Sequence, residues 1–232
     1  MRKLTKMTFL GLAALGVAAS NANAADMNFL PGIGGSYQMG VTSIKEARFR
    51  KVIKQQYDFS CGSAALATLL SYHYDNPVGE QEVFVSMYEA GDEEKIRTEG
   101  FSLLDMKTYL ERQDFQANGY RVSLDKLMEI GVPGVVLINT QGYYHFVVVK
   151  GLRNNEILVG DPALGAKIYS REEFEKMWNG IVFVITDRLD VAKRTFNDKR
   201  EWLVRHKAPF GSALNRHGLA SFTMLLRGPG QF

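Results

Sequence analysis

The sequence predicts an α+β fold in which N-terminal helices pack on a mostly antiparallel sheet. Two observations support this prediction. Between residues 63 and 130 the apolar residues recur at helical spacing, and after residue 134 they give way to short β-branched runs separated by turn residues. A block of helices followed by a block of strands is typical of the α+β class, whereas alternating helices and strands would indicate a parallel sheet.

The expected helices come first along the chain. Residues 63–74 are small or apolar on nearly every side, which indicates a helix buried in the domain. Residues 80–90 form a second expected helix, and the charge run at residues 92–94 is interpreted only as a solvated surface. Ser102 and Ser123 each precede a helical pattern and are expected as N-caps, because their hydroxyls can accept from free backbone N–H groups.

The second half of the chain has the pattern of strands joined by tight turns. Four strands are expected, at residues 135–139, 146–150, 156–159 and 181–186. Gly142 and Asn154 lie at plausible hairpin tips. Ser170 and Glu173 have the spacing of a capping box, which predicts one more helix before the last strand.

The N-terminus has the pattern of an export signal. Arg2, Lys3 and Lys6 precede an apolar stretch at residues 8–19, and a small-x-small pattern ends at Ala24. We therefore expect residues 1–24 to be a signal peptide cleaved after Ala24, which implies a periplasmic protein. The stretch is shorter than the roughly 20 residues of a membrane span. No second long apolar run follows, so no stable span is expected in the mature chain.

Three segments are expected after the signal. Residues 25–49 are Gly-rich without a clear period and predict a flexible N-terminal segment. Residues 50–187 contain the predicted helices and strands of the folded domain. Residues 188–232 are expected to be a basic C-terminal helix and tail, with a charged amphipathic helix at residues 191–206.

The charge distribution does not fit a nucleic-acid-binding protein. The formal net charge is +3, but without the first 24 residues the basic residues equal the 25 acidic ones. Residues 187–232 carry nine Lys or Arg and four Asp or Glu, so the body of the domain is mildly acidic. A neutral chain with an acidic body lacks the basic face that nucleic acid requires.

The chain has one cysteine, Cys61, which excludes an intramolecular disulfide and a Cys-rich zinc site. A lone thiol in an exported protein is either a small buried hydrophobic residue or a nucleophile. Cys61 directly precedes the first predicted helix, where free N–H groups and the helix dipole favour a thiolate. Its position therefore favours the nucleophile.

A thiolate nucleophile needs a histidine partner. His73 lies at the far end of the same predicted helix, roughly 18 Å away at 1.5 Å per residue, and His206 and His217 lie in the tail. His145 remains, at the mouth of a predicted strand. Asp161 follows the next strand, so a hairpin between the two strands can bring it to the imidazole as an orienting acceptor.

An oxyanion donor completes the candidate site. Gln55, six residues before Cys61, can offer a side-chain amide beside the Cys61 N–H. Each signal has a structural alternative, because His145 can be a satisfied core residue and Asp161 a simple turn residue. The order Gln, Cys, His, Asp is more specific than any of its members.

Four segments resemble the motifs of the papain-like double-glycine cysteine peptidases, the family fused to bacteriocin-exporting transporters. These segments, within residues 50–186, are Gln55-Gln-Tyr-Asp-Phe-Ser-Cys61-Gly-Ser, Gly100-Phe-Ser-Leu-Leu-Asp105, Gly142-Tyr-Tyr-His145-Phe-Val-Val-Val and Asp161-Pro162. The resemblance implies a papain-like α+β fold without metal or cofactor. It implies Cys61 as nucleophile, His145 as general base and then acid, Asp161 as its orienter, and Gln55 in the oxyanion hole.

The chain also departs from the transporter-fused members. These usually have an acid directly before the cysteine, where Ser60 stands here, and the export signal resembles a stand-alone exported form. Such stand-alone relatives occur in operons for functional amyloid secretion. The resemblance therefore implies an exported polypeptide or amyloid-system protein as substrate, while the oligomeric state is not indicated.

The leading hypothesis is an exported cysteine endopeptidase that cleaves a secreted protein or leader after small residues such as Gly-Gly. One alternative is a peptide-binding or chaperone module that holds an export substrate without cleaving it. Another is a different thiol acyl-transfer enzyme, such as a cell-wall amidase or a transglutaminase-like protein. The context of Gln55 and of Asp105 favours the peptidase.

Overall fold

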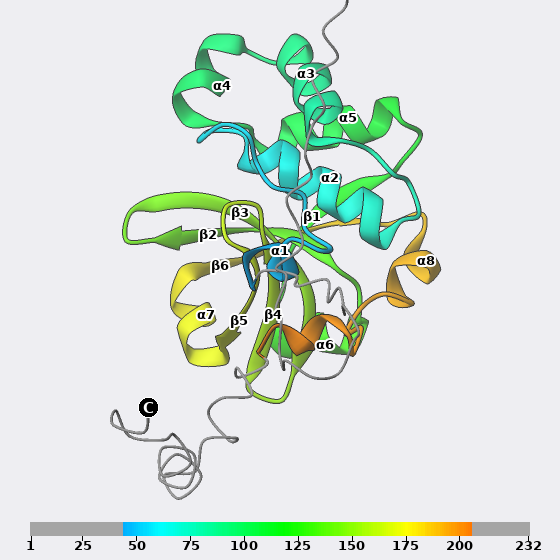
Figure 1. Cartoon of the computed structure of the whole chain (residues 1–232). Helices are drawn as coiled ribbons and strands as arrows, with labels where there is room; N and C mark the ends of the chain where they lie inside the picture. The colour runs from blue at the N-terminus through cyan, green and yellow to red at the C-terminus, as the bar shows by residue number, and fades with distance from the viewer. Residues whose placement is uncertain (1–43, 206–232) are drawn as a thin grey trace, which may run out of the picture. The chain divides into compact units, whose positions relative to one another are not determined.

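A group of helices lies beside one antiparallel sheet in the computed structural model, which describes residues 44–205 (Figure 1). The helices are α1 (Ile44–Arg48), α2 (Cys61–His73), α3 (Glu80–Ala90), α4 (Glu93–Glu99), α5 (Leu103–Arg112), α6 (Leu124–Ile130), α7 (Arg171–Met177), α8 (Leu189–Lys193) and the 3-10 helix η1 (Glu201–Arg205). The strands are β1 (Ala117–Arg121), β2 (Gly134–Thr140), β3 (Tyr143–Arg153), β4 (Glu156–Asp161), β5 (Gly165–Ser170) and β6 (Trp178–Ile185).

The six strands form one sheet in the order β1-β6-β2-β3-β4-β5, and every neighbouring pair is antiparallel. Tight turns join β2 to β3 and β3 to β4 at the tips expected from Gly142 and Asn154. The edge strands β1 and β5 were not expected. An edge strand pairs on one side only and tolerates polar residues, and residues 118–121 of β1 are exposed, so neither strand has a strong β-branched pattern.

Helix α2 connects the two layers. It packs against α3 on one side and β3 on the other, and its residues from Cys61 to Leu70 are buried. Its small side chains, Ala64, Ala65 and Ala67, are fully buried and allow close approach on both sides. The expected helix at residues 80–90 matches α3.

The predicted helix caps are present. Ser102, Ser123 and Ser170 each accept a hydrogen bond from a backbone N–H in the first turn of α5, α6 and α7. The charge run at residues 92–94 does more than cover the surface, because Asp92 caps α4 by accepting from the N–H of Lys95.

The expected flexible segment at residues 25–49 is wrong for residues 44–48, which form α1. This helix packs against the turn between β4 and β5. A Cβ at Gly165 would lie only 2.7 Å from Arg48 Cβ, so the close contact requires glycine. The expected signal peptide and residues 25–43 lie outside the described residues.

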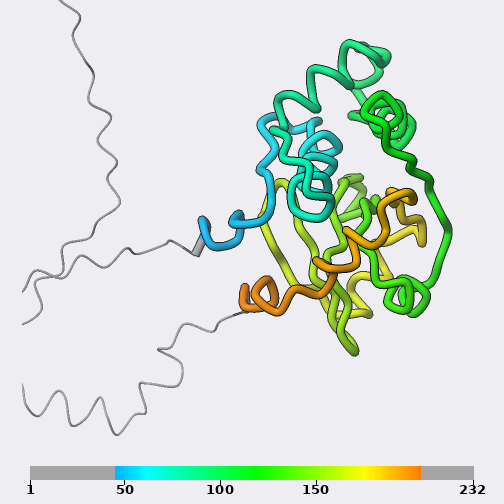
Figure 2. Tube along the Cα trace, turned by 90° about the vertical axis from the view of Figure 1, so that its right-hand side faces the viewer, coloured from blue at the N-terminus to red at the C-terminus, as the bar shows by residue number. Residues whose placement is uncertain are grey.

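The expected helix at residues 191–206 is also wrong. Residues 189–205, which we call the strap, form α8 and η1 with irregular chain between them, and Figure 2 shows the strap running across the strands. Asn197 adopts a positive φ of 62°, which interrupts any helix, and its N–H donates to the carbonyl of Lys150 at 3.0 Å. Residues 206–232 of the expected basic tail lie outside the described residues.

A buried lysine joins the strap to the sheet. Lys150 stands at an irregularity in the pairing of β3 with β4, where a bulge can redirect a side chain. Its fully buried ammonium forms an ion pair with Glu201 and donates to the carbonyl of Lys51 at 2.7 Å. Burial lowers the pKa of Lys150, and Glu201 opposes this effect. Lys51 in turn pairs with Asp198 at 2.8 Å.

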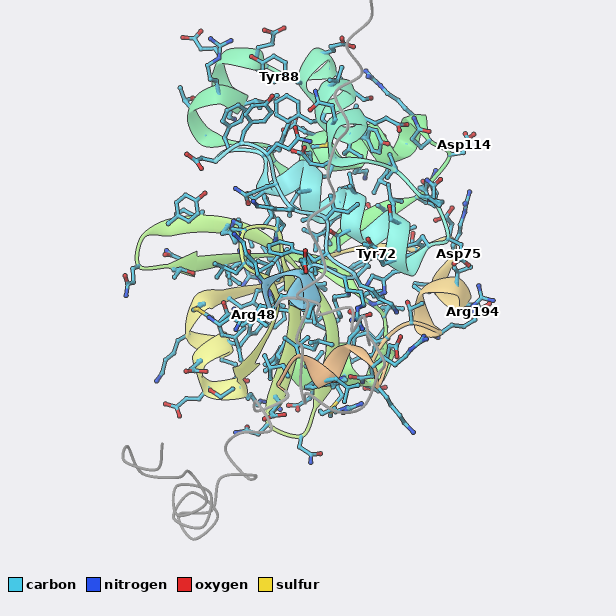
Figure 3. The ribbon with its side chains drawn as sticks, in the orientation of Figure 1. Arg48, Tyr72, Asp75, Tyr88, Asp114 and Arg194 are labelled. Atoms are coloured by element: carbon cyan, nitrogen blue, oxygen red, sulfur yellow. The ribbon has the colours of Figure 1, made fainter. Side chains whose placement is uncertain are left out.

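The strap also holds the C-terminal end of α2. Thr195 Oγ1 lies 2.7 Å from His73 Nδ1, and Arg194 pairs with Asp75 at 3.1 Å. Figure 3 shows Asp75 and Arg194 next to each other just past the end of this helix. Within residues 44–205, no helix combines the length and the apolar character that crossing a membrane requires.

We expect Glu201→Gln to lower the free energy of unfolding by about 3 kcal/mol, because it leaves the buried Lys150 ammonium without its carboxylate. Urea denaturation of the purified protein measures the change. Glu172→Gln is the matched control, since Glu172 pairs with Lys176 on the surface, where the two side chains are 78% and 70% exposed. Equal denaturation midpoints for the two variants would contradict the role assigned to Glu201.

Candidate active site

Cys61 is the first residue of α2, and the loop before it is held by a serine. The Ser60 hydroxyl donates to the carbonyl of Tyr57 at 3.0 Å and accepts from the Tyr57 N–H at 3.1 Å. Ser60 therefore makes no side-chain cap on α2. The first N–H groups of a helix have no acceptor within the helix, so this loop places Cys61 beside uncapped backbone donors.

The glycine after the cysteine allows α2 to start against the neighbouring segment. A Cβ at Gly62 would lie 2.9 Å from both Met106 Cε and Phe101 Cβ. Gly100, with a φ of 81°, turns the chain into this contact. The segment around Cys61 thus packs directly against the segment around Phe101, although the two are far apart in the sequence.

The structure brings His145 and Asp161 together. His145 Nε2 donates to Asp161 Oδ1 at 2.8 Å, and both side chains are buried. The same oxygen accepts from the N–H groups of Ala163 at 2.8 Å and Leu164 at 3.2 Å. Asp161 is therefore a turn aspartate as well as the imidazole's partner, and the turn fixes the carboxylate that orients the ring.

The electrostatics of His145 favour the imidazolium. Burial by itself would lower the pKa of His145, but the hydrogen bond to Asp161 and then the contact with Cys61 raise it to about 9. Burial opposes ionisation of Asp161 as well, yet the hydrogen bond from His145 and the turn N–H groups keep its pKa below the usual value. In an unfolded chain histidine titrates near 6.5. The charged pair therefore stabilises the fold fully below pH 6.5 and loses this contribution as the pH rises through about 9.

Cys61 lies near the same imidazole. Asp161 uses Nε2, and Cys61 is close enough to the ring to raise the pKa of His145. Nδ1 is buried and has no hydrogen-bond partner among the described residues, so it is the nitrogen left for the thiol. The thiol, the imidazole and the carboxylate thus follow one another in space. His73, by contrast, lies at the opposite end of α2 with Thr195, as the helix length predicts.

Gln55 lies close to these residues but is directed toward the loop. Its N–H donates to the carbonyl of Pro162 at 3.0 Å, which ties it to the residue after Asp161. Its side-chain Nε2 donates to the carbonyl of Tyr57 at 2.9 Å and approaches that of Asp58 at 3.4 Å. In this structure the amide therefore binds loop carbonyls beside Cys61.

Tyr143 lies beside the predicted site residues but was assigned no role from the sequence. This residue stands two before His145 on β3, so the two side chains share a face of the strand, and their rings stack at 5.9 Å with an angle of 28°. The Tyr143 hydroxyl donates to the carbonyl of Asp58 at 3.0 Å. Burial, and then the charges of Cys61, Asp58 and Asp161, raise the pKa of Tyr143, so it stays a neutral donor. In the sequence, only the spacing of two residues between Tyr143 and His145, just before a predicted strand, could have indicated this contact.

A cleft of about 980 Å³ opens onto Cys61. Its walls come from residues 97–104, at the end of α4 and the start of α5, and from the hairpin of β2 and β3. Figure 1 shows where these elements lie in the fold. Most of the residues facing it are aromatic or aliphatic, including Phe59, Phe101, Leu104 and Phe146. The cleft reaches the volume of pockets that bind drug-sized ligands, so a short peptide segment can enter it and reach the thiol.

Comparison with known proteins gives one family. Residues 50–190 match the model of the Peptidase C39 family. The chain is 47% identical over 156 residues to the "Probable functional amyloid protease FapD" of Pseudomonas aeruginosa, covering 67% of this chain and 69% of that one. It is 46% identical to the protein of the same name from Pseudomonas fluorescens, covering 62% of this chain and 64% of that one.

A solved structure has a similar fold. It is a double glycine motif protease from an AMS/PCAT transporter in complex with the leader peptide. The TM-score is 0.50 at 30% sequence identity, covering 58% of this chain and 89% of that one. The expected papain-like α+β fold is confirmed by this similarity together with the observed order of helices and antiparallel strands.

We expect Asp161→Asn to lower the pKa of His145 from about 9 by about 1 to 3 pH units, because a neutral amide no longer stabilises the imidazolium. Titration of the His145 ring resonances by NMR measures the change. Asp125→Asn is the control, since Asp125 pairs with Arg171 on the surface. An unchanged midpoint in Asp161→Asn would show that the carboxylate does not set the charge of His145.

Proposed function

The chain belongs to the peptidase C39 family, and we propose that it is an exported cysteine endopeptidase that cleaves a secreted polypeptide after small residues. The observation that carries this proposal is the succession of thiol, imidazole and carboxylate formed by Cys61, His145 and Asp161, of which Cys61 lines the cleft. It supports acyl-enzyme chemistry, because a thiolate beside an imidazolium is the activated nucleophile of thiol peptidases.

In the first step the Cys61 thiolate attacks the carbonyl carbon of the scissile bond. Negative charge develops on the carbonyl oxygen, and donors placed beforehand stabilise it. The Cys61 N–H at the start of α2 is one such donor. The Gln55 amide is the proposed second donor, and it would exchange the carbonyl of Tyr57 for the substrate oxygen.

Proton transfers by His145 complete the cycle. With a pKa of about 9 the imidazole carries a proton at neutral pH and donates it to the leaving amine as the C–N bond breaks. The neutral imidazole then accepts a proton from water, which attacks the thioester carbonyl and releases the acid and the thiolate. Asp161 holds the ring in place throughout through Nε2.

The relatives support a substrate class. Two Pseudomonas relatives carry the name "Probable functional amyloid protease FapD", and the similar solved structure holds a leader peptide. We propose an exported protein of an amyloid system, or its leader, as the substrate, with Gly-Gly before the scissile bond. The export signal expected at residues 1–24 supports a periplasmic site of action.

We expect the p-nitrophenyl ester of a blocked Gly-Gly peptide to acylate Cys61 and to turn over. Mass spectrometry of the intact protein locates the adduct on the only cysteine of the chain. Cys61→Ala abolishes the adduct, and His145→Gln slows acylation by roughly a thousandfold because it removes the proton acceptor. A peptide with an internal Gly-Gly, followed by chromatography, then tests amide cleavage.

The control is His73→Gln, whose partner Thr195 lies at the opposite end of α2, and whose melting temperature is measured alongside. It should acylate as fast as the wild type. A loss equal to that of His145→Gln would contradict the assignment of the base. Acylation of Cys61 no faster than that of free cysteine, together with peptide binding without cleavage, would support the alternative of a peptide-binding module.

A further inference from the structure

Tyr143 lies over the proposed catalytic pair. Its ring stacks on His145, which is only 6% exposed, while Tyr143 itself is 54% exposed. The Tyr143 ring is therefore stacked with a buried imidazole, while about half of the tyrosine surface stays exposed. Tyr143 and Cys61 line the same cleft, so a peptide that approaches the thiol passes this ring.

The position of the ring is fixed at both ends. At the backbone, Tyr143 pairs with Thr140 of β2, directly after the turn that Gly142 makes with a φ of 92°. At the tip, the hydroxyl donates to the carbonyl of Asp58 at 3.0 Å. Because both ends are tied, the ring cannot swing aside without losing this hydrogen bond.

That hydrogen bond joins two segments that line the cleft. Tyr143 belongs to the hairpin of β2 and β3, whereas Asp58 stands three residues before Cys61 in the loop that leads into α2. Gln55 Nε2 approaches the same carbonyl at 3.4 Å, so the loop is held from two sides. The bond therefore forms a bridge between the hairpin and the loop that carries the thiol.

We propose that Tyr143 is a specificity-determining residue whose ring and hydroxyl narrow the cleft beside Cys61, so that only a segment without bulky side chains reaches the thiol. A glycine backbone can pass beside the bridge, whereas a branched side chain would have to displace the ring or break the bond to Asp58. This inference deepens the proposed function, because it names the residue that selects small residues at the scissile bond.

The first test uses no peptide substrate, so it remains valid even if the proposed function fails. The rates at which Cys61 reacts with iodoacetamide and with bulky N-naphthyl iodoacetamide are measured by mass spectrometry of the intact protein. Their ratio is divided by the same ratio for free cysteine. In the wild type we expect this normalised ratio to be well above one, because Cys61 reacts much more slowly with the bulky reagent. The ratio should fall by roughly tenfold in Tyr143→Ala, and by less in Tyr143→Phe because phenylalanine keeps the ring.

Tyr120→Ala is the matched control, because Tyr120 is a comparably exposed tyrosine, 46% exposed, on the edge strand β1. It should keep the ratio of the wild type. An unchanged ratio in Tyr143→Ala, or a wild type that discriminates no better than free cysteine, would overturn the proposal. Melting temperatures of all variants exclude partial unfolding as the reason for a lower ratio.

The second test links the residue to cleavage. The kcat/KM values of two peptides, with Gly-Gly or Gly-Val before the scissile bond, are compared in the wild type and in Tyr143→Ala. We expect the preference for Gly-Gly to fall in the variant. If the wild type cleaves neither peptide, the proposed function fails while the alkylation ratio still decides the role of Tyr143. Cleavage with an unchanged preference would overturn that role alone.

Discussion

The buried hydrogen bond between His145 and Asp161 is the constraint on which the rest of the site depends. The two residues stand on neighbouring antiparallel strands, so their contact requires one particular register of β3 against β4. A slip of one residue would turn either side chain to the opposite face of the sheet. The turn after Asp161, which leads from β4 into β5, fixes the carboxylate itself, since its N–H groups bind the same oxygen that orients the imidazole. The charge on His145 therefore follows from the pairing of β3 with β4 and from the turn after Asp161.

The motifs that indicate the chemistry also pack the two layers together. Gly62 is needed because α2 starts against Phe101, and Gln55 is tied through its N–H to Pro162 beside the carboxylate. The proposed nucleophile lies on a helix and the proposed base on a strand, so the two meet only when the helix approaches the sheet closely. The residues between the proposed catalytic groups are thus constrained by packing as strongly as the groups themselves. Short, widely spaced segments of the sequence therefore lie together around the proposed site.

Local sequence patterns predicted much of this structure. The features that they did not predict share one physical reason, which is that they depend on contacts between distant residues. Serine caps, hairpin tips and the pairing of His145 with Asp161 follow from spacing along the chain, and the structure has all of them. The burial of Lys150 depends instead on a bulge and on a carboxylate 51 positions away, Glu201, and nothing near either residue indicates the other. The hydroxyl of Tyr143 likewise reaches Asp58 across 85 positions. A lysine in a β-branched run and a tyrosine beside a hairpin tip both have the ordinary sequence pattern of surface residues.

The strap shows how a segment outside the site supports it. Its sequence is basic overall, but two of its three acidic residues, Asp198 and Glu201, form ion pairs with lysines. One of these lysines, Lys51, stands four residues before Gln55, and its carbonyl accepts from Lys150 on the strand that also carries His145. The strap thus holds Lys51 in place, at the start of the segment that runs through Gln55 to Cys61. An unpaired buried ammonium is costly. The Glu201 carboxylate therefore stabilises the position from which Lys150 donates to the carbonyl of Lys51. The position of the proposed oxyanion donor therefore depends on an ion pair on the far side of the strand from the reacting groups.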